Sequence, residues 1–339
     1  MRIFRSLNEL ATARSEILRP VVTTGFFDGL HLGHRSLLDE LSSWARDIEG
    51  TPCVLTFQSH PASTLRGWGP PRIHSLEHRL VLLEQAGVEV ALVLEFSEEL
   101  AEWSPETFCS QILTGAYGSG HFLMGFDACV GRDRQGTFEY LSARASDLEL
   151  EIRQATPYQL EGERVSSTLV RRAIDQGDLQ RLKRLTGRPY SIFGTVMEGD
   201  GRGRELGFPT ANLDVQIEAV LPAGVYFARV HPISPEGAAA AIPEPCPALV
   251  NLGRRPTFKK PLERAGGEKH GQRIFEPGLD TIEAHLLDFS GDLYGARLEV
   301  TFLERLRSEM KFSGPDALVQ QIRRDEAEFR SWLERTPIG

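Results

Sequence analysis

The stretch GFFDGLHLGH occupies residues 25–34 and decides how the first half of the chain folds. It ends an apolar run from Pro20 to Phe27 and precedes apolar residues at helical spacing, so it predicts a strand, a tight turn and a helix. A helix N-terminus offers free N–H groups and the positive end of a dipole. His31 and His34 can add hydrogen bonds to phosphate oxygens. The turn is therefore a predicted phosphate site, although a strand–helix turn with two surface histidines is the alternative for an HxGH motif alone.

The surrounding residues continue the alternation of strand and helix. Strands are expected at 52–57, 88–96 and 121–126, and helices at 76–86 and from Ser104 onward. This order predicts a parallel sheet covered by helices, with the ligand at the carboxyl ends of its strands. Short helices are expected at 168–175 and 179–185. The break at residues 186–189 places a domain boundary between a first domain, 1–186, and a second, 187–339.

The second half has a different pattern. Short runs rich in valine, phenylalanine and tyrosine are separated by glycine and proline, which predicts a small β-barrel. A helical pattern from about Asp316 to Leu333 closes the chain. The segments 232–247 and 258–278 are expected to be loops.

Composition excludes several classes of protein. The net charge of −9 over 339 residues argues against a nucleic-acid partner. Four cysteines without a CxxC pair argue against zinc and for reduced thiols. The N-terminus lacks the apolar segment of a signal peptide, and no run is long enough to span a membrane. The expectation is a cytoplasmic protein without a membrane partner, and a weak homo-oligomer stays open.

A second motif, VSSTLVR, lies at residues 165–171. Hydroxyls at a helix start usually serve as caps. Beside an HxGH turn they can instead bind phosphate oxygens, with Arg171 on a pyrophosphate. Together, GxFDGxHxGH and SSTxxR resemble the adenylyltransferase half of the bacterial bifunctional riboflavin kinase/FAD synthetase family, which belongs to the HxGH nucleotidyltransferases. The resemblance spans about residues 18–186 and implies a Rossmann-like α/β domain.

This resemblance implies transfer of AMP from ATP to the phosphate of FMN, with release of pyrophosphate. It assigns catalytic roles to His31, His34 and Arg171: the two histidines stabilise the transition state, and Arg171 holds phosphates. The implied nucleotide- and phosphate-binding residues are Gly25, Phe27, Asp28, Gly29, Gly33, Ser167 and Thr168. The implied flavin-binding residues are His60, Phe126 and Asp127. The chain departs from the family at 126–131, where Ala-Cys-Val replaces an aromatic–Arg–aromatic core. A riboflavin kinase with weak or lost adenylyltransferase activity is therefore the first alternative.

A third motif, GDGRGRELGFPTAN, lies at residues 199–212. Its glycines let backbone N–H groups surround a phosphate. Thr210 and Asn212 alternate along an extended segment and offer oxygen ligands for the Mg²⁺ that accompanies ATP. A glycine-rich hairpin is the alternative for the glycines alone. The string GRELGFPTANL, with segments 221–226 and 251–258, resembles riboflavin kinases, and the resemblance spans about residues 187–328.

The kinase resemblance implies that ATP phosphorylates riboflavin to FMN. Along the expected strand at 281–289, Glu283 and His285 face one side, and Glu283 is the implied base for the ribityl hydroxyl. The implied nucleotide-binding residues are Gly199, Gly203, Arg204, Gly207 and Pro209. Arg307 is the implied flavin contact. The prediction is a bifunctional enzyme whose partners are the small molecules riboflavin, FMN and ATP, with FAD as product. A non-catalytic flavin or nucleotide sensor is the alternative from another class, and the negative charge disfavours an RNA-modifying enzyme.

Overall fold

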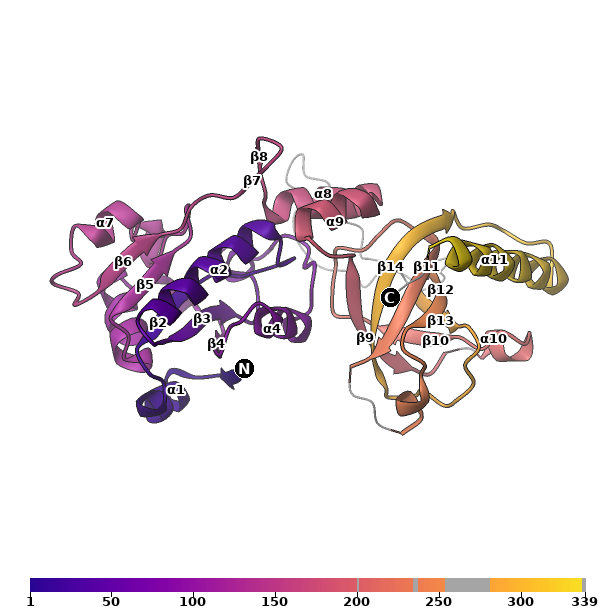
Figure 1. Ribbon diagram of the computed structural model, residues 1–339, viewed down its shortest axis with the longest axis horizontal. Helices are drawn as coiled ribbons and strands as arrows, with labels where there is room; N and C mark the ends of the chain where they lie inside the picture. The colour runs from indigo at the N-terminus through magenta and orange to yellow at the C-terminus, as the bar shows by residue number, and fades with distance from the viewer. Residues whose placement is uncertain (200, 234–236, 254–280, 337–339) are drawn as a thin grey trace. The chain divides into compact units, whose positions relative to one another are not determined.

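The computed structural model describes residues 1–199, 201–233, 237–253 and 281–336 (Figure 1). The chain divides into two compact units, Met1–Val170 and Arg171–Gly339. Each unit has its own sheet and its own buried core. The expected segment 258–278 lies outside the described residues.

The first unit contains a parallel six-stranded sheet, as predicted. Its strand order is β1-β4-β3-β2-β5-β6. The strands are β1 (Arg2–Phe4), β2 (Pro20–Thr24), β3 (Thr51–Phe57), β4 (Val90–Leu94), β5 (His121–Met124) and β6 (Glu151–Gln154). The two edge strands were not predicted. Strand β1 has only three residues and β6 has the largely polar sequence EIRQ, so neither shows a clear alternation of apolar and polar residues. A small hairpin follows, formed by β7 (Gln159–Leu160) and β8 (Glu163–Arg164).

Helices cover both faces of this sheet, because successive strand residues enter two separate cores. Val21 and Val54 pack in one core, whereas the adjacent Val22 and Leu55 pack in the other. The helices are α1 (Leu7–Ala13), α2 (Leu32–Asp47), α3 (Pro61–Arg66), α4 (Leu76–Gln85), α5 (Glu98–Ala101), α6 (Pro105–Phe108) and α7 (Phe138–Ser142). A π-helix, Cys109–Tyr117, continues α6. The helix expected from Ser104 onward is confirmed, and the Ser104 hydroxyl caps it by accepting from the Thr107 N–H.

The order of the sheet identifies its ligand-binding edge. Strand β2 pairs with β3 on one side and β5 on the other, and the chain runs from β2 to β3 and β4 before it crosses back to β5. In open α/β sheets such a reversal opens a crevice at the carboxyl ends of the strands. The chain leaves β2 at Thr24 and enters α2 through the GFFDGLHLGH turn, so the motif lies in that crevice.

The second unit is a closed antiparallel barrel with the order β10-β13-β12-β11-β14-β9, as predicted. The strands are β9 (Ser191–Met197), β10 (Ala211–Asp214), β11 (Gly224–Pro232), β12 (Cys246–Gly253), β13 (Thr281–Leu286) and β14 (Arg297–Arg307). Its helices are α9 (Leu179–Thr186), α10 (Arg202–Glu205) and α11 (Pro315–Arg335), and α8 (Ser167–Gln176) crosses the division between the units. The Phe329 ring of α11 stacks on Phe227 of β11 at 4.4 Å between centroids, so the helix covers the barrel wall.

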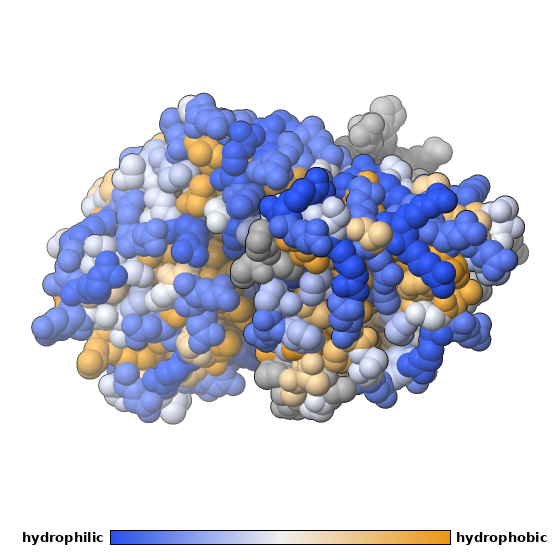
Figure 2. Space-filling view, turned by 45° about the vertical axis from the view of Figure 1, so that its right-hand side comes forward, coloured by the Kyte–Doolittle hydropathy of each residue, from blue (hydrophilic) through white to orange (hydrophobic). Residues whose placement is uncertain are grey.

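The surface in Figure 2 is mainly hydrophilic, with hydrophobic residues in separate patches. In the part of the chain that the structure describes, no helix is long and apolar enough to cross a membrane. All four cysteines are free thiols, and three of them are buried. Burial raises the pKa of Cys109 to about 12 and that of Cys246 to about 11.

Candidate active sites

The turn between β2 and α2 combines unusual backbone angles with close packing. Phe27, Gly29 and Leu30 have φ values of +55°, +83° and +31°. Such angles cost a non-glycine residue on the order of 1 kcal/mol or more, and they persist where the surroundings fix them. Phe27 and Leu30 are fully buried. A Cβ at Gly25 would lie 2.9 Å from the Phe27 ring, so the turn is built around that aromatic side chain.

The two histidines are held together at the start of α2. The His34 N–H donates to Nδ1 of His31 at 3.2 Å, and the rings stack at 3.7 Å between centroids. Because Nδ1 of His31 accepts this bond, a neutral ring carries its proton on Nε2. The edge of Phe27 packs against His34 at 5.2 Å. A Cβ at Gly33 would lie 3.2 Å from the His31 ring, so a side chain at this position would crowd the ring, and glycine leaves room for it. These contacts fix the orientation of the two histidine rings.

Asp28 ties this turn to two other segments. Its carboxylate is buried and accepts from the N–H groups of Ile73 and His74 at 3.1 Å. Its backbone carbonyl accepts from the hydroxyl of Ser167 at 2.8 Å. Asp28 therefore orients the turn through backbone contacts, and it brings the SST motif to the HxGH motif.

Arg79 of α4 also contacts the turn after β2 and was not predicted from the sequence. Its buried guanidinium donates to the carbonyls of Phe26 at 2.6 Å and Phe57 at 2.8 Å, and to the Thr56 hydroxyl at 3.2 Å. It also lies over the Phe26 ring at 4.1 Å. Burial lowers the pKa of Arg79 to about 10, opposed by the nearby Asp28 carboxylate. Arg79 thus joins the carboxyl ends of β2 and β3.

The HxGH turn, the segment after β5 and the start of α8 border a cavity of about 240 Å³. Six predicted residues line it: His31, Gly33, His34, Phe126, Asp127 and Ser167. Arg164 of β8 also lines it and was not predicted. Its guanidinium lies 2.6 Å from the Asp127 carboxylate and 5.4 Å from the centre of the Phe126 ring. Arg164 brings a permanent positive charge to a cavity suited to phosphates.

Other residues predicted for this site do not line the cavity. The turn between β2 and α2 contains four of them, Gly25, Phe27, Asp28 and Gly29. His60 caps α3, since its Nδ1 accepts from the Ala62 N–H at 3.1 Å, and its ring meets Phe26 edge-on at 4.9 Å. Thr168 is exposed at the start of α8. Arg171 follows Ser167 by one turn on the same helix and is half-buried.

The barrel unit contains a larger cavity, of about 410 Å³. Five predicted residues line it: Gly203, Thr210, Asn212, Glu283 and Arg307. Strand register brings them together, because Asn212 of β10 pairs with Glu283 of β13, which also pairs with Asn251 of β12. The expected alternation along β13 is confirmed, with Ile282 and Ala284 buried and Glu283 facing the cavity.

The glycine-rich loop lies directly against these side chains. A Cβ at Gly199 would lie 2.1 Å from the Asn212 side-chain nitrogen. A Cβ at Gly203 would lie 2.5 Å from the Phe208 carbonyl and 3.1 Å from the Thr210 hydroxyl. Glycine at both positions lets the loop backbone reach the predicted phosphate and metal ligands.

Arg307 lines the cavity while bound to a residue that the sequence analysis did not identify. Its guanidinium makes bonds of 2.6–3.1 Å to both carboxylate oxygens of Asp325 on α11. Asp325 is only 3% exposed and also accepts from Gln321 at 2.8 Å. The pair joins β14 to α11, and its bidentate geometry fixes the orientation of the guanidinium.

Comparisons with known proteins match both units. The profile described as FAD synthetase matches residues 14–169, and the one described as riboflavin kinase matches residues 186–333. Proteins called bifunctional riboflavin kinase/FMN adenylyltransferase are similar along most of their length. The Pseudomonas fluorescens protein is 33% identical, covering 98% of this chain and 97% of its own. The Bacillus subtilis protein is 32% identical, covering 93% of this chain and 93% of its own. The chain belongs to this bifunctional family.

A solved structure has the same fold throughout. A crystal structure from Streptococcus pneumoniae, titled as a macrolide-efflux protein, superposes with a TM-score of 0.76. It is 28% identical and covers 98% of this chain and all of its own. Its title names efflux, whereas both profiles and the curated relatives name flavin enzymes.

The riboflavin kinase unit has a further cavity, of about 400 Å³, beside the larger one. Two predicted nucleotide-binding residues, Arg204 and Pro209, line it together with Asp292 and Tyr294. Thr210 lines both cavities. Gly207, with φ of +84°, lies in the turn between Arg204 and Pro209. Among the described residues, no group of three or more His, Cys, Asp or Glu is placed to hold a metal ion.

Proposed function

We propose that the enzyme divides its two reactions, riboflavin to FMN and FMN to FAD, between the two units. The observation that carries this division is that each unit has its own cavity lined by one of the two motif sets. Matches to the two family profiles, one in each half, support the same order.

In the first unit, the phosphate of FMN attacks the α-phosphorus of ATP and pyrophosphate leaves. The attacking phosphate is already ionised at neutral pH, so catalysis consists of positioning and charge stabilisation. His31 and His34 stabilise the transition state. Ser167, Thr168 and Arg171 hold phosphate oxygens, and His60, Phe126 and Asp127 contact the flavin. The fixed histidine pair at a helix N-terminus supports these roles.

In the second unit, Glu283 removes the proton from the ribityl hydroxyl of riboflavin as that oxygen attacks the γ-phosphorus of ATP, the bond from that phosphorus to the β,γ-bridging oxygen breaks and ADP leaves. Riboflavin occupies the larger cavity with Arg307, and ATP occupies the adjoining one with Arg204 and Pro209. Thr210 supports this arrangement, because it lines both cavities at the place where the γ-phosphate has to meet the hydroxyl.

Mg²⁺ fits the residues at that junction. Thr210 and Asn212 offer the hydroxyl and carboxamide oxygens that Mg²⁺ accepts, and both line the larger cavity. The ion neutralises phosphate charge when it arrives with ATP. The backbones of Gly199, Gly203 and Gly207 complete the phosphate-binding loop.

The proposed riboflavin kinase domain begins at residue 187, after α9. The start of the matching profile at residue 186 supports this boundary. The proposed compartment is the cytoplasm, supported by four free cysteines.

The test is chromatography of the products that the purified protein forms from riboflavin and Mg·ATP. FMN followed by FAD is expected, and chelation of Mg²⁺ with EDTA should stop riboflavin phosphorylation. FMN alone would identify a kinase that has lost adenylylation, with the 126–131 loop as the first suspect. Flavin binding without any turnover would contradict the proposal and favour a sensor.

A further inference from the structure

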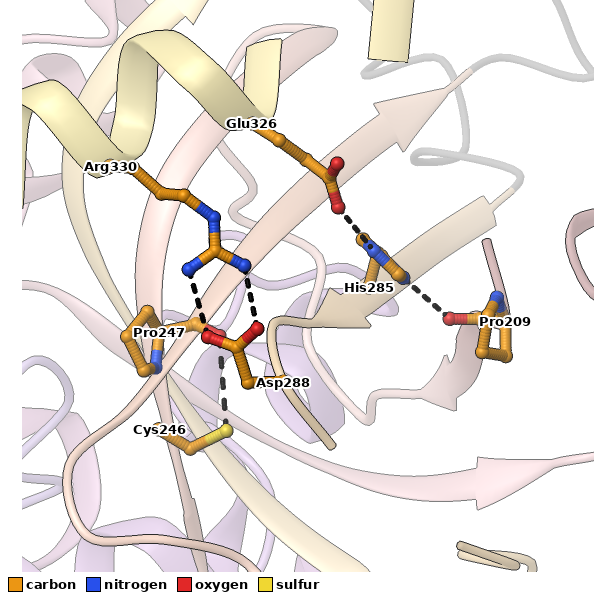
Figure 3. A network of polar contacts seen from close by, with 7 residues as sticks. All are labelled: Pro209, Cys246, Pro247, His285, Asp288, Glu326 and Arg330. Carbon is orange, nitrogen blue, oxygen red and sulfur yellow. Dashed lines mark hydrogen bonds and ion pairs between the residues drawn. The ribbon is translucent and has the colours of Figure 1, made fainter. Parts of the chain in front are cut away.

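A histidine beside the proposed kinase base connects three elements of the barrel unit. His285 lies two residues after Glu283 on β13, on the same face of the strand. Its Nδ1 is 2.8 Å from the Pro209 carbonyl, and its Nε2 is 3.0 Å from a carboxylate oxygen of Glu326 on α11 (Figure 3). The His285 side chain is 13% exposed and that of Glu326 is 23% exposed, so the connection is shielded from solvent on most sides.

The two partners of His285 determine which of its ring nitrogens must donate. A peptide carbonyl and an ionised carboxylate only accept hydrogen bonds, so both bonds form together only while each ring nitrogen carries a proton. Phe208 meets the ring edge-on at 5.7 Å between centroids and limits its rotation. The ring therefore holds the Pro209 carbonyl at a set distance from α11.

We propose that His285 and Glu326 are positioning residues for Mg·ATP. The Pro209 carbonyl belongs to the planar peptide group that leads into Thr210, so fixing this oxygen fixes the direction in which the Thr210 side chain leaves the backbone. Asn212 follows two residues later on β10. The inference rests on the proposed roles of Thr210 and Asn212, and it adds the residues that hold them in place.

Two substitutions separate the two hydrogen bonds of His285. The side-chain nitrogen of His285→Asn takes the approximate place of Nδ1 and can keep the bond to Pro209. That of His285→Gln takes the approximate place of Nε2 and can keep the bond to Glu326. Loss of a hydrogen bond changes an equilibrium by up to about tenfold. We expect the KM for Mg·ATP to rise about tenfold in His285→Gln and about threefold in His285→Asn, with kcat changed less than about twofold.

The same chain provides matched controls. Asp288, which follows β13, forms a bidentate pair with Arg330 of α11 at 2.6 and 2.8 Å, and Arg330 lies one turn beyond Glu326 (Figure 3). Neither residue lines either kinase cavity. Asp288→Asn should leave the KM for Mg·ATP unchanged, and every variant should keep wild-type adenylylation of supplied FMN. Thermal unfolding of each variant checks that the barrel is intact.

Thr210→Ala distinguishes this inference from the proposed function. If Thr210→Ala leaves the KM for Mg·ATP unchanged, the proposed metal and phosphate site is wrong. If Thr210→Ala raises it while both His285 variants match the wild type, the site stands and the positioning role is wrong. Equal effects of Asn and Gln at position 285 would also overturn the inference, because the Pro209 bond would then make no difference.

Discussion

The two proposed catalytic sites of this chain are assembled in different ways. The proposed adenylylation site is centred on a continuous turn, residues 25–34, placed by a parallel sheet at the point where the strand order reverses. The proposed kinase site is assembled across strands, where Asn212, Glu283 and Asn251 meet by register although up to 71 positions separate them in sequence. Local backbone angles shape the first site, whereas barrel closure shapes the second.

This difference determines what can disturb each site. Phe27 and Gly29 set the HxGH turn through their own φ angles, and Asp28 anchors it through two backbone N–H groups and the Ser167 hydroxyl. The kinase cavity depends instead on α11, whose Asp325 and Glu326 bind groups on other elements of the barrel. Distant substitutions should therefore affect the kinase more readily than the adenylyltransferase.

The largest expected effect is that of Glu283→Gln. Removing a general base slows a reaction by about 10²–10⁴-fold, and glutamine keeps the size of the side chain. We expect riboflavin phosphorylation to fall by this factor, while FMN supplied directly is still converted to FAD. Separate assays of the two reactions measure the split. Loss of both activities in a folded protein would break the proposed division between the units.

His31→Ala is the converse experiment. Removing one donor to transition-state charge costs about 10²–10³-fold in rate. The Nδ1 atom that accepts from the His34 N–H is lost as well, so the helix start also loses its cap. We expect FAD formation to fall by at least this factor, with riboflavin phosphorylation unchanged as the internal control. A normal adenylylation rate would show that the histidine pair is not the catalytic centre.

The sequence predicted the contiguous features well. The parallel sheet, the barrel, the HxGH turn and the alternation along β13 all follow from local patterns, and the structure confirms them. Pairing with β11 extends strand β14 to Arg307 and carries that residue to the cavity.

Residues that act through tertiary contacts escaped prediction. Arg79 lies in an ordinary helical pattern, and nothing local indicates that it binds the ends of two strands. Asp325 looks like an exposed residue of an amphipathic helix, yet it is buried against Arg307. Arg164 belongs to a two-residue strand whose place beside Asp127 depends on the folded chain.

Asp325→Asn should have the next largest effect, and it tests the dependence of the kinase site on α11. Breaking a buried ion pair by removing one partner costs about 3 kcal/mol or more, because the other charge stays buried. We expect a lower unfolding temperature for the barrel unit and a higher KM for riboflavin, since Arg307 loses its bidentate partner. Calorimetry and the two assays measure these effects. Equal loss of stability in the first unit would mean that the units do not unfold separately.

Asp288→Asn should have the smallest effect, because it removes an exposed partner of Arg330 on the same helix. Hydrogen bonding to Arg330 lowers the pKa of Asp288 below its ordinary value. A lowered carboxyl pKa gives stability that is present above the unfolded pKa and is lost as the pH falls through the folded one. The two side chains are 69% and 50% exposed, so screening limits the pair to about 0.5 kcal/mol. Urea unfolding should show that Asp288→Asn lowers the free energy of unfolding by about 0.5 kcal/mol at pH 7 and leaves it unchanged near pH 2. A loss above about 2 kcal/mol at pH 7 would mean that this exposed pair contributes as much as a buried one.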